Sequence, residues 1–193
     1  MKKIVIISPA KSQKAINPLD PSVERPKTLP MAREIFKLIK PMSLEETKNL
    51  YSLSDKKAKE VWQMHQEHGN ELFYAIEMFS GQVFKELNLD EYDKEYLNEH
   101  VRIIDPLYGI LKPYDTVGLY RLDFKVPFKF NLKEYWKQTV NDELKDCEII
   151  NLASLEYSSI ITHPMKEIEL EPGNSIKQKS GKTLHKLLKN KEI

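Results

Sequence analysis

The sequence predicts an α/β fold, a single domain with a small central sheet surrounded by helices. Short, unbroken apolar runs at residues 4–7 and 147–150 each lead directly into a polar turn, which is the pattern of buried parallel strands. Segments with helical spacing of apolar residues lie between these runs. The length of 193 residues fits one domain with a sizeable core, so we expect one domain over residues 1–193.

The two polar turns are the main functional signal. The first reads Ile-Ser-Pro-Ala-Lys at residues 7–11, and the second reads Asn-Leu-Ala-Ser-Leu-Glu-Tyr at residues 151–157. If both strands belong to one sheet, the turns converge at the edge where open α/β sheets bind ligands. The residues expected in this cleft are Ser8, Lys11, Asn151, Ser154 and Glu156. The alternative is a pair of ordinary strand-to-helix turns, with Ser154 capping a helix.

The charges are segregated along the chain although the net charge is only +1. Residues 1–40 carry nine Lys or Arg and three acids, whereas residues 41–100 carry six and thirteen. Residues 101–133 and 171–193 are again basic. The chain can therefore present a basic face if these blocks meet in space; scattered, solvated charge is the alternative.

The composition also suggests a compartment. The first apolar run has four residues, so we expect neither a signal peptide nor a membrane span. Cys147 is the one cysteine, which excludes an internal disulfide, and its apolar surroundings indicate a role in the core. These observations predict a cytoplasmic protein that does not bind membranes.

The first half of the chain is predicted to be mainly helical. Four prolines within residues 17–30 preclude a regular helix or central strand there. A helix follows over residues 31–39, Ser-Leu-Glu-Glu at residues 43–46 is a capping box, and Ser54 begins another helix. Residues 73–79 are apolar and are compatible with either a strand or a helix.

Further helices are expected after Gly81 through residue 87 and over residues 93–104. Residues 132–145 form an amphipathic helix, with Trp136, Val140 and Leu144 on one face. A third strand is expected within residues 165–170, and residues 179–189 form a basic helix with a leucine stripe.

Residues 106–115 contain the densest turn signal, centred on Gly109 and ended by Pro113. Arg102 and Lys112 flank this turn, and a helix is expected to lead into it, so the segment is similar to a helix-hairpin-helix element of nucleic-acid-binding proteins. One glycine is present where two are usual. Hairpin amides near Tyr108 could bind a phosphate, and a side chain at Gly109 should hinder that approach. The alternative is a structural turn that buries its apolar residues.

Two other pairs of residues are candidates for binding. Arg121 and Asp123 would share a face of a strand, with Arg121 as a candidate ligand of phosphate and Asp123 as its ion-pair partner. His65 and His68 have the spacing of metal ligands, but we expect solvated helix surface instead. The sequence predicts no metal site and no cofactor, since it lacks a glycine-rich phosphate loop and a nucleophile elbow.

Six blocks in this order resemble the YaaA family of bacterial peroxide-stress proteins. They are Ile-Ser-Pro-Ala-Lys (7–11), Phe-Ser-Gly-Gln-Val (79–83), Leu-Tyr-Gly-Ile-Leu-Lys-Pro-Tyr-Asp (107–115), Tyr-Arg-Leu-Asp (120–123), Tyr135-Trp136 and Asn-Leu-Ala-Ser-Leu-Glu-Tyr (151–157). The resemblance implies a single α/β domain with a helix-hairpin-helix element, a cytoplasmic location, and DNA binding linked to protection against hydrogen peroxide. It implies no particular chemical reaction.

The chain departs from the family pattern at several places. Asp105-Pro106 stands where relatives generally have Ser-Gly, and Lys112 replaces an arginine. Lys179-Ser-Gly-Lys182 corresponds to a Lys-x-x-Arg-Gly pattern. Relatives continue into a further aromatic-containing segment, so this domain is expected to be either a natural short form or a truncated one.

Two main functions follow. In the first, the protein binds duplex or junction DNA without strong sequence preference, through cations and hairpin amides. The residues assigned to this contact are Lys11, Arg102, Tyr108, Gly109, Lys112, Arg121, Lys179 and Lys182. In the alternative, the cleft is the active site of an enzyme acting on a nucleotide or nucleic acid, with Glu156 as candidate general base. A third interpretation is an interaction module whose acidic residues 41–100 dock a basic partner.

Overall fold

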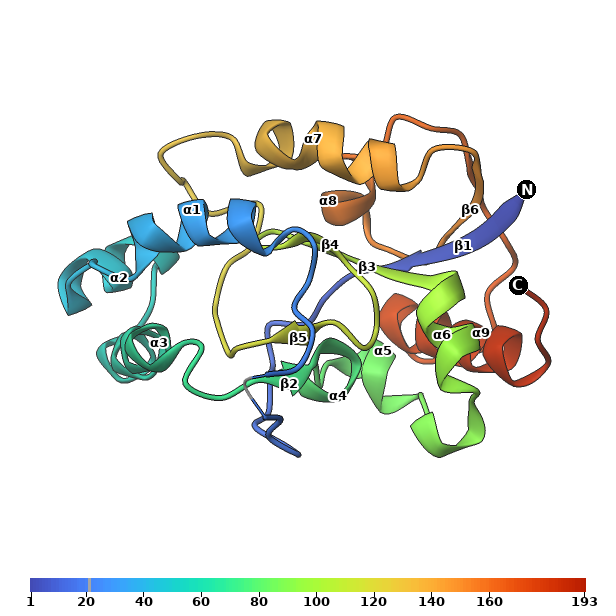
Figure 1. Cartoon of the computed structure of the whole chain (residues 1–193), viewed down its shortest axis with the longest axis horizontal. Coiled ribbons are helices and arrows are strands. Elements are labelled where there is room, and N and C mark those ends of the chain that lie inside the picture. Colours follow the sequence, from blue (N-terminus) through green and yellow to red (C-terminus); the bar gives the residue numbers. More distant parts are fainter. Residues whose placement is uncertain (21) are drawn as a thin grey trace.

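A five-stranded sheet forms the centre of the molecule, in the order β4-β3-β1-β6-β7 (Figure 1). The computed structural model describes residues 1–20 and 22–193. The strands are β1 (Lys2–Ile7), β3 (Val101–Asp105), β4 (Gly109–Leu111), β6 (Cys147–Asn151) and β7 (Met165–Lys166). β3, β1, β6 and β7 run parallel, and β4 pairs antiparallel with β3. The predicted α/β class is confirmed.

β1 is the central strand, and its sequence explains why. Val5 pairs with Val101 of β3 on one side and with Ile150 of β6 on the other. The four residues from Ile4 to Ile7 are almost completely buried, because helices cover both faces of the sheet. Both strands predicted from unbroken apolar runs are confirmed.

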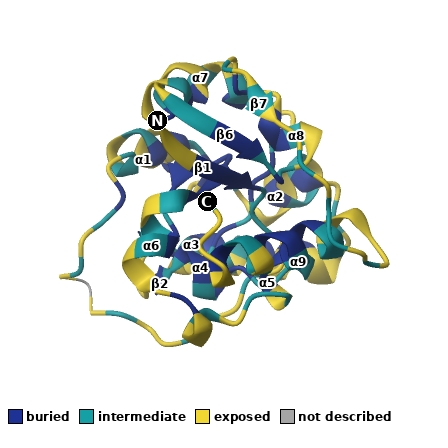
Figure 2. Cartoon of the chain, turned by 90° about the vertical axis from the view of Figure 1, so that its right-hand side faces the viewer, coloured by how far each residue is buried: buried dark blue, intermediate teal, exposed yellow. Residues whose placement is uncertain are grey.

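Helices cover the two faces of the sheet. α7 lies over one face, while α6 and α9 lie under the other (Figures 1 and 2). The helices are α1 (Leu29–Ile39), α2 (Leu44–Tyr51), α3 (Asp55–Glu67), α4 (Ala75–Met78), α5 (Gln82–Lys85), α6 (Lys94–His100), α7 (Leu132–Glu143), α8 (Leu155–Ser158) and α9 (Ile176–Lys189), with a 3-10 turn at Leu89–Glu91. A small ribbon pairs β2 (Phe73–Tyr74) with β5 (Thr116–Val117).

Local capping signals fix several helix starts. The predicted capping box is confirmed: Ser43 Oγ accepts from the Glu46 amide, and Glu46 accepts from the Ser43 amide. Side chains of Asp93, Asn131 and Ser175 cap α6, α7 and α9 in the same way. These caps satisfy amides that have no partner within the helix.

The prediction of one helix over residues 93–104 was wrong. α6 ends at His100, and the next five residues form β3, in which every residue is buried. Val101, Ile103 and Ile104 are β-branched, and their pairing with the parallel strand β1 outweighs the helical pattern. The turn at residues 106–108 therefore joins two strands, β3 and β4, and is entered from a strand and not from a helix.

Other boundaries also differ from the expectation. Residues 73–79 divide into β2 and α4, so the ambiguous pattern contained both structures. Arg121 and Asp123 lie in an irregular segment and not in a strand, and β7 ends at Lys166. Cys147 is half-buried at the start of β6. Within the described residues, no helix is long and apolar enough to cross a membrane.

Candidate phosphate-binding edge of the sheet

The two signature turns lie side by side at the carboxyl edge of the sheet. Ile6 pairs with Asn151, and the Leu152 amide donates to the Ile6 carbonyl at 3.0 Å. Beyond the strands, Ser8 Oγ accepts from the Ser154 amide at 2.9 Å. The prediction that these turns share one edge is therefore confirmed. β3 flanks β1 on one side, and β6, which comes later in the chain, flanks it on the other. The strand order reverses here, so this edge is a topological switch point.

Two cations from distant parts of the sequence meet at this edge. Lys11 Nζ lies 3.2 Å from Asp123 Oδ2, and Arg121 Nε lies 3.9 Å from the same oxygen. Lys11 is 56% exposed and Arg121 is 23% exposed, while the Asp123 side chain is 8% exposed. Because one buried carboxylate faces two cations, the group keeps a positive charge and can attract an anion.

The hollow between these residues is small. Pro9, Lys11, Arg121 and Tyr157 contribute to its walls, and it encloses about 10 Å³, roughly the space of one water molecule. The hollow at this edge is narrow, and Arg121 in its wall is partly buried. It does not offer the enclosed volume of a typical small-molecule site.

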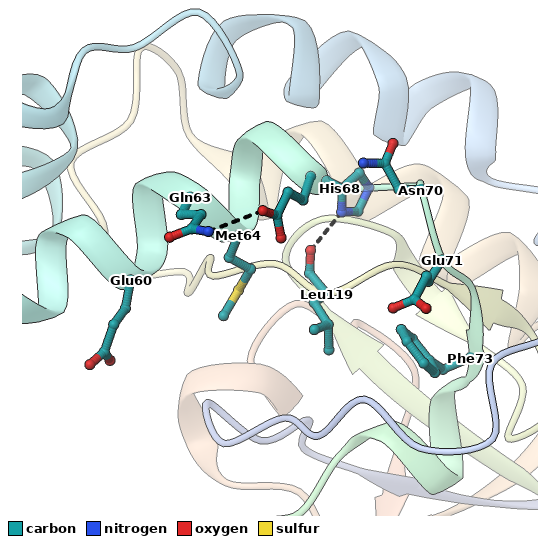
Figure 3. A pocket seen from close by; sticks show the side chains of 9 residues that line it. Glu60, Gln63, Met64, His68, Asn70, Glu71, Phe73 and Leu119 are labelled. Atoms are coloured by element: carbon teal, nitrogen blue, oxygen red, sulfur yellow. Dashed lines mark hydrogen bonds between the residues drawn. The ribbon is translucent and has the colours of Figure 1, made fainter.

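Two helices hold the backbone of Arg121 in place. The Tyr51 hydroxyl of α2 donates to the Arg121 carbonyl at 2.6 Å, and the Arg121 amide donates to His65 Nε2 of α3 at 3.1 Å. One turn along, His68 Nδ1 donates to the Leu119 carbonyl at 2.7 Å, as Figure 3 shows. These contacts position the segment that carries Arg121.

The expectation that both histidines are solvated was therefore wrong. His65 is buried against α1 and α2, and the ring of His68 stacks on Phe36. Burial lowers the pKa of each histidine from 6.5 to about 4. Their partners lie some fifty residues away in the sequence, so no local pattern could reveal the contacts. Among the described residues, no group of three or more His, Cys, Asp or Glu side chains is arranged to hold a metal ion.

The remaining predicted cleft residues have protein partners. Asn151 Oδ1 accepts from the Ala153 amide, and Asn151 Nδ2 donates to Glu167 at 3.0 Å. Glu156 pairs with Lys125 at 3.2 Å. Its Oε1 atom is buried and has no hydrogen-bond partner in the part of the chain that the structure describes. Ser8 and Ser154 thus join the turns, whereas Asn151 stabilises one of them.

The hairpin residues are mostly engaged inside the fold. Arg102 is buried, donates to the Asn98 and Val101 carbonyls and pairs with Glu143 at 3.2 Å. Tyr108 is fully buried, and Trp136 packs directly against Gly109. These contacts match the alternative interpretation of this segment, a structural turn.

Other predicted cations lie away from the edge. Since β4 runs antiparallel to β3, Lys112 lies toward the amino end of β3. Lys179 and Lys182 lie on α9, which packs against α5 through Gly181 and Val83. The structure therefore brings Lys11 and Arg121 together and leaves these other cations apart from them.

Asp105 is a residue whose importance the sequence did not reveal. It ends β3, is fully buried, and accepts from the Leu107 and Tyr108 amides and from the Tyr120 hydroxyl. Burial raises the pKa of its carboxyl group to about 6. The signal was an Asp-Pro pair after a β-branched run, which favours a turn closed by the carboxylate. Through Tyr120, Asp105 also anchors the segment that carries Arg121.

Comparison with known proteins decides the family. A family model described as "Peroxide stress protein YaaA" matches residues 3–190. The chain belongs to the YaaA family. A UPF0246 protein of Finegoldia magna is 37% identical over 131 residues, which cover 66% of this chain and 53% of the relative. A UPF0246 protein of Clostridioides difficile is 32% identical, and the match covers 85% of this chain and 71% of the relative. A UPF0246 protein of Francisella tularensis is also 32% identical, and the match covers 82% of this chain and 70% of the relative.

The buried histidines of this YaaA-family chain predict how its stability depends on pH. Each binds a proton in the unfolded state near pH 6.5 but in the folded state only near pH 4, so acidification between these values favours unfolding. Asp105 acts in the opposite direction, since its folded pKa is raised from 3.8 to about 6. Asp115, whose pKa burial also raises, acts in the same direction as Asp105. Each histidine should lower the free energy of unfolding by up to about 1.4 kcal/mol per pH unit on acidification from pH 6 toward 4.

Urea unfolding at pH 6.5, 5.5 and 4.5 measures this dependence. The variant His68→Gln should lose less stability on acidification than the wild type, because only one of the two histidines remains. An equal pH dependence of both proteins would show that the folded protein does not lower the pKa of His68.

Proposed function

We propose that this YaaA-family chain binds the phosphate backbone of DNA along the carboxyl edge of its sheet, as part of the peroxide-stress response in the cytoplasm. The observation that carries the proposal is the convergence of Lys11 and Arg121 on the buried carboxylate of Asp123. Arginine and lysine side chains beside each other are the usual partners of successive phosphates.

Two further cations, Lys125 and Lys133, lie beside α8. Together with Lys11 and Arg121 they form what we call the basic strip. Lys125, which is 77% exposed, pairs with Glu156, and Lys133 Nζ donates to Ser159 Oγ at 2.8 Å. The strip therefore has four cations and two carboxylates. Phosphates can compete with these carboxylates for the cations, and release of counterions from DNA adds to the affinity.

The shape of the edge favours binding over catalysis. An enzyme acting on a nucleotide needs a pocket that encloses the reacting group, and the hollow here encloses about 10 Å³. Glu156, the candidate general base, is paired with Lys125. DNA lying across an open strip needs no enclosed volume, and this contact would carry no base-specific information.

Binding of a short duplex should weaken steeply as salt increases. With about four cations meeting phosphates, the slope of log affinity against log salt should be roughly −3 to −4. Lys11→Ala should reduce the slope by about one and weaken binding at low salt, because it removes one phosphate contact. Fluorescence anisotropy at several salt concentrations measures both quantities.

Lys2→Ala is the matched control, since Lys2 begins β1, at the opposite edge of the sheet from the turn that carries Lys11, and likewise pairs with a carboxylate, Glu99. It should leave the slope unchanged. The proposal fails if the two variants change the slope equally, or if the wild type shows no dependence on salt. A junction can replace the duplex in the same assay to test which form of DNA is preferred.

A further inference from the structure

A second pocket lies on the other side of the aromatic residues that border the edge. It encloses about 220 Å³ between the start of α1, the end of α3 and the turn that joins β3 to β4. Tyr108 forms part of its wall. The ring of Tyr120, which borders the hollow at the edge, packs against Tyr108 with 5.7 Å between centroids. The two sites are therefore neighbours that use different side chains.

Two guanidinium groups line this pocket without acidic partners. Arg25 and Arg33 both contribute to the wall, and none of the described lining residues is acidic. In the part of the chain that the structure covers, neither arginine lies within 4 Å of a carboxylate. Arg25 Nε donates to the Thr116 carbonyl at 3.3 Å, which orients its guanidinium group. Two positive charges thus face a cavity with no counter-charge of its own.

The backbone adds to this positive potential. Leu29, the first residue of α1, lines the pocket, and the 11-residue helix has no acidic residue in its first turn. The start of a helix carries a partial positive charge that attracts anions. Arg25 and Arg33 add full positive charges to this partial charge.

The rest of the wall is apolar or aromatic. Phe36 and Leu107 line the pocket together with His68, whose ring stacks on Phe36 with 4.0 Å between centroids. The hydroxyl of Tyr108 lies 3.5 Å from His68 Nε2, at the limit of a hydrogen bond. The pocket therefore places apolar and aromatic side chains beside its two cations.

We propose that this pocket binds a compact phosphate monoester whose organic part is an apolar ring. Two arginines suit a phosphate because each can form paired, charge-assisted hydrogen bonds to its oxygens. The volume leaves room for one ring beside the phosphate and is below that of typical drug-sized sites. Phenyl phosphate is the simplest molecule with both parts and serves as the probe.

Isothermal titration of the full chain with phenyl phosphate tests the proposal. We expect saturable binding of one molecule per chain, weakened about tenfold or more by either Arg33→Gln or Arg25→Gln, because each removes a charge-assisted contact. Lys27→Gln is the matched control: Lys27 lies between these positions in sequence, is exposed, and does not line the pocket. It should change the affinity less than twofold. Arg33 is also exposed, so its replacement should leave the fold intact, and a thermal melt checks this.

Inorganic phosphate and phenol test the two halves of the site separately, and each should bind more weakly than phenyl phosphate. Failure to saturate at about 10 mM by the folded wild type would overturn the proposal, as would an equal effect of Arg33→Gln and Lys27→Gln. Binding of inorganic phosphate as tight as that of phenyl phosphate would contradict the role of the apolar wall. Since the basic strip uses other residues, these outcomes neither support nor contradict the proposed binding of DNA.

Discussion

Replacing Gly109 by valine is expected to destabilise the protein strongly. Gly109 has a φ of +73°, and an added Cβ would lie 2.3 Å from the ring of Trp136. That ring is fully buried and donates to the Pro106 carbonyl at 2.9 Å, so it cannot move aside. A β-branched residue at positive φ costs about 1–2 kcal/mol, and overpacking adds about 1–3 kcal/mol or more. The sum is a large part of the 5–15 kcal/mol that is typical of a whole domain.

Chemical denaturation of two alanine variants separates the two causes. Gly69 also has a positive φ, +86°, but an added Cβ there would meet no described atom within 4 Å. Gly69→Ala should therefore cost about 1 kcal/mol, whereas Gly109→Ala should cost several kcal/mol because it also meets Trp136. Equal losses in the two variants would contradict the packing of Trp136 on the hairpin. If Gly109→Ala loses more stability than Gly69→Ala, any loss of DNA binding by Gly109→Val has to be explained through the fold before a direct phosphate contact is considered.

Replacing Asp105 by alanine is expected to destabilise the protein by a similarly large amount. The substitution leaves the buried Leu107 and Tyr108 amides and the Tyr120 hydroxyl without their acceptor. Each buried donor left unsatisfied costs about 1–3 kcal/mol, so a total loss of at least about 3 kcal/mol is expected. Urea unfolding at pH 7.5 measures it.

Two milder variants provide a comparison for the stability of Asp105→Ala. Asp105→Asn keeps an oxygen that can accept from both amides, and Tyr120→Phe removes one donor alone. Both should be clearly more stable than Asp105→Ala. If Asp105→Ala proved as stable as Asp105→Asn, the carboxylate would not hold the turn.

Much of the fold could be predicted because the local sequence pattern is sufficient to identify its central strands. The residues from Ile4 to Ile7 are buried on both faces, so they form an unbroken apolar run that no surface element would show. β3 was missed because Arg102 and Asp105 interrupt its apolar pattern. Arg102 pairs with Glu143, and Asp105 accepts a hydrogen bond from Tyr120. Neither partner lies within the segment, so the local sequence pattern does not reveal them.

The same distinction applies to the candidate site. Ser8 and Ser154 were predicted to share an edge, because neighbouring parallel strands place their turns together. Lys11 and Arg121 were predicted individually, but their meeting at Asp123 depends on how residues 118–123 cross the edge. Hydrogen bonds from Tyr51 of α2 and His65 of α3 to the backbone of Arg121 set that path. Arg102 was assigned to phosphate because its burial could not be seen in the sequence.

We propose that DNA contacts the carboxyl edge of the sheet and not the hairpin. Backbone amide signals of the 22.6 kDa chain, followed by NMR while a short duplex is added, distinguish these two surfaces. We expect the largest shifts at residues 8–11, 120–125 and 154–159, with little change at residues 106–112. Shifts confined to residues 106–112, or spread evenly over the surface, would contradict it.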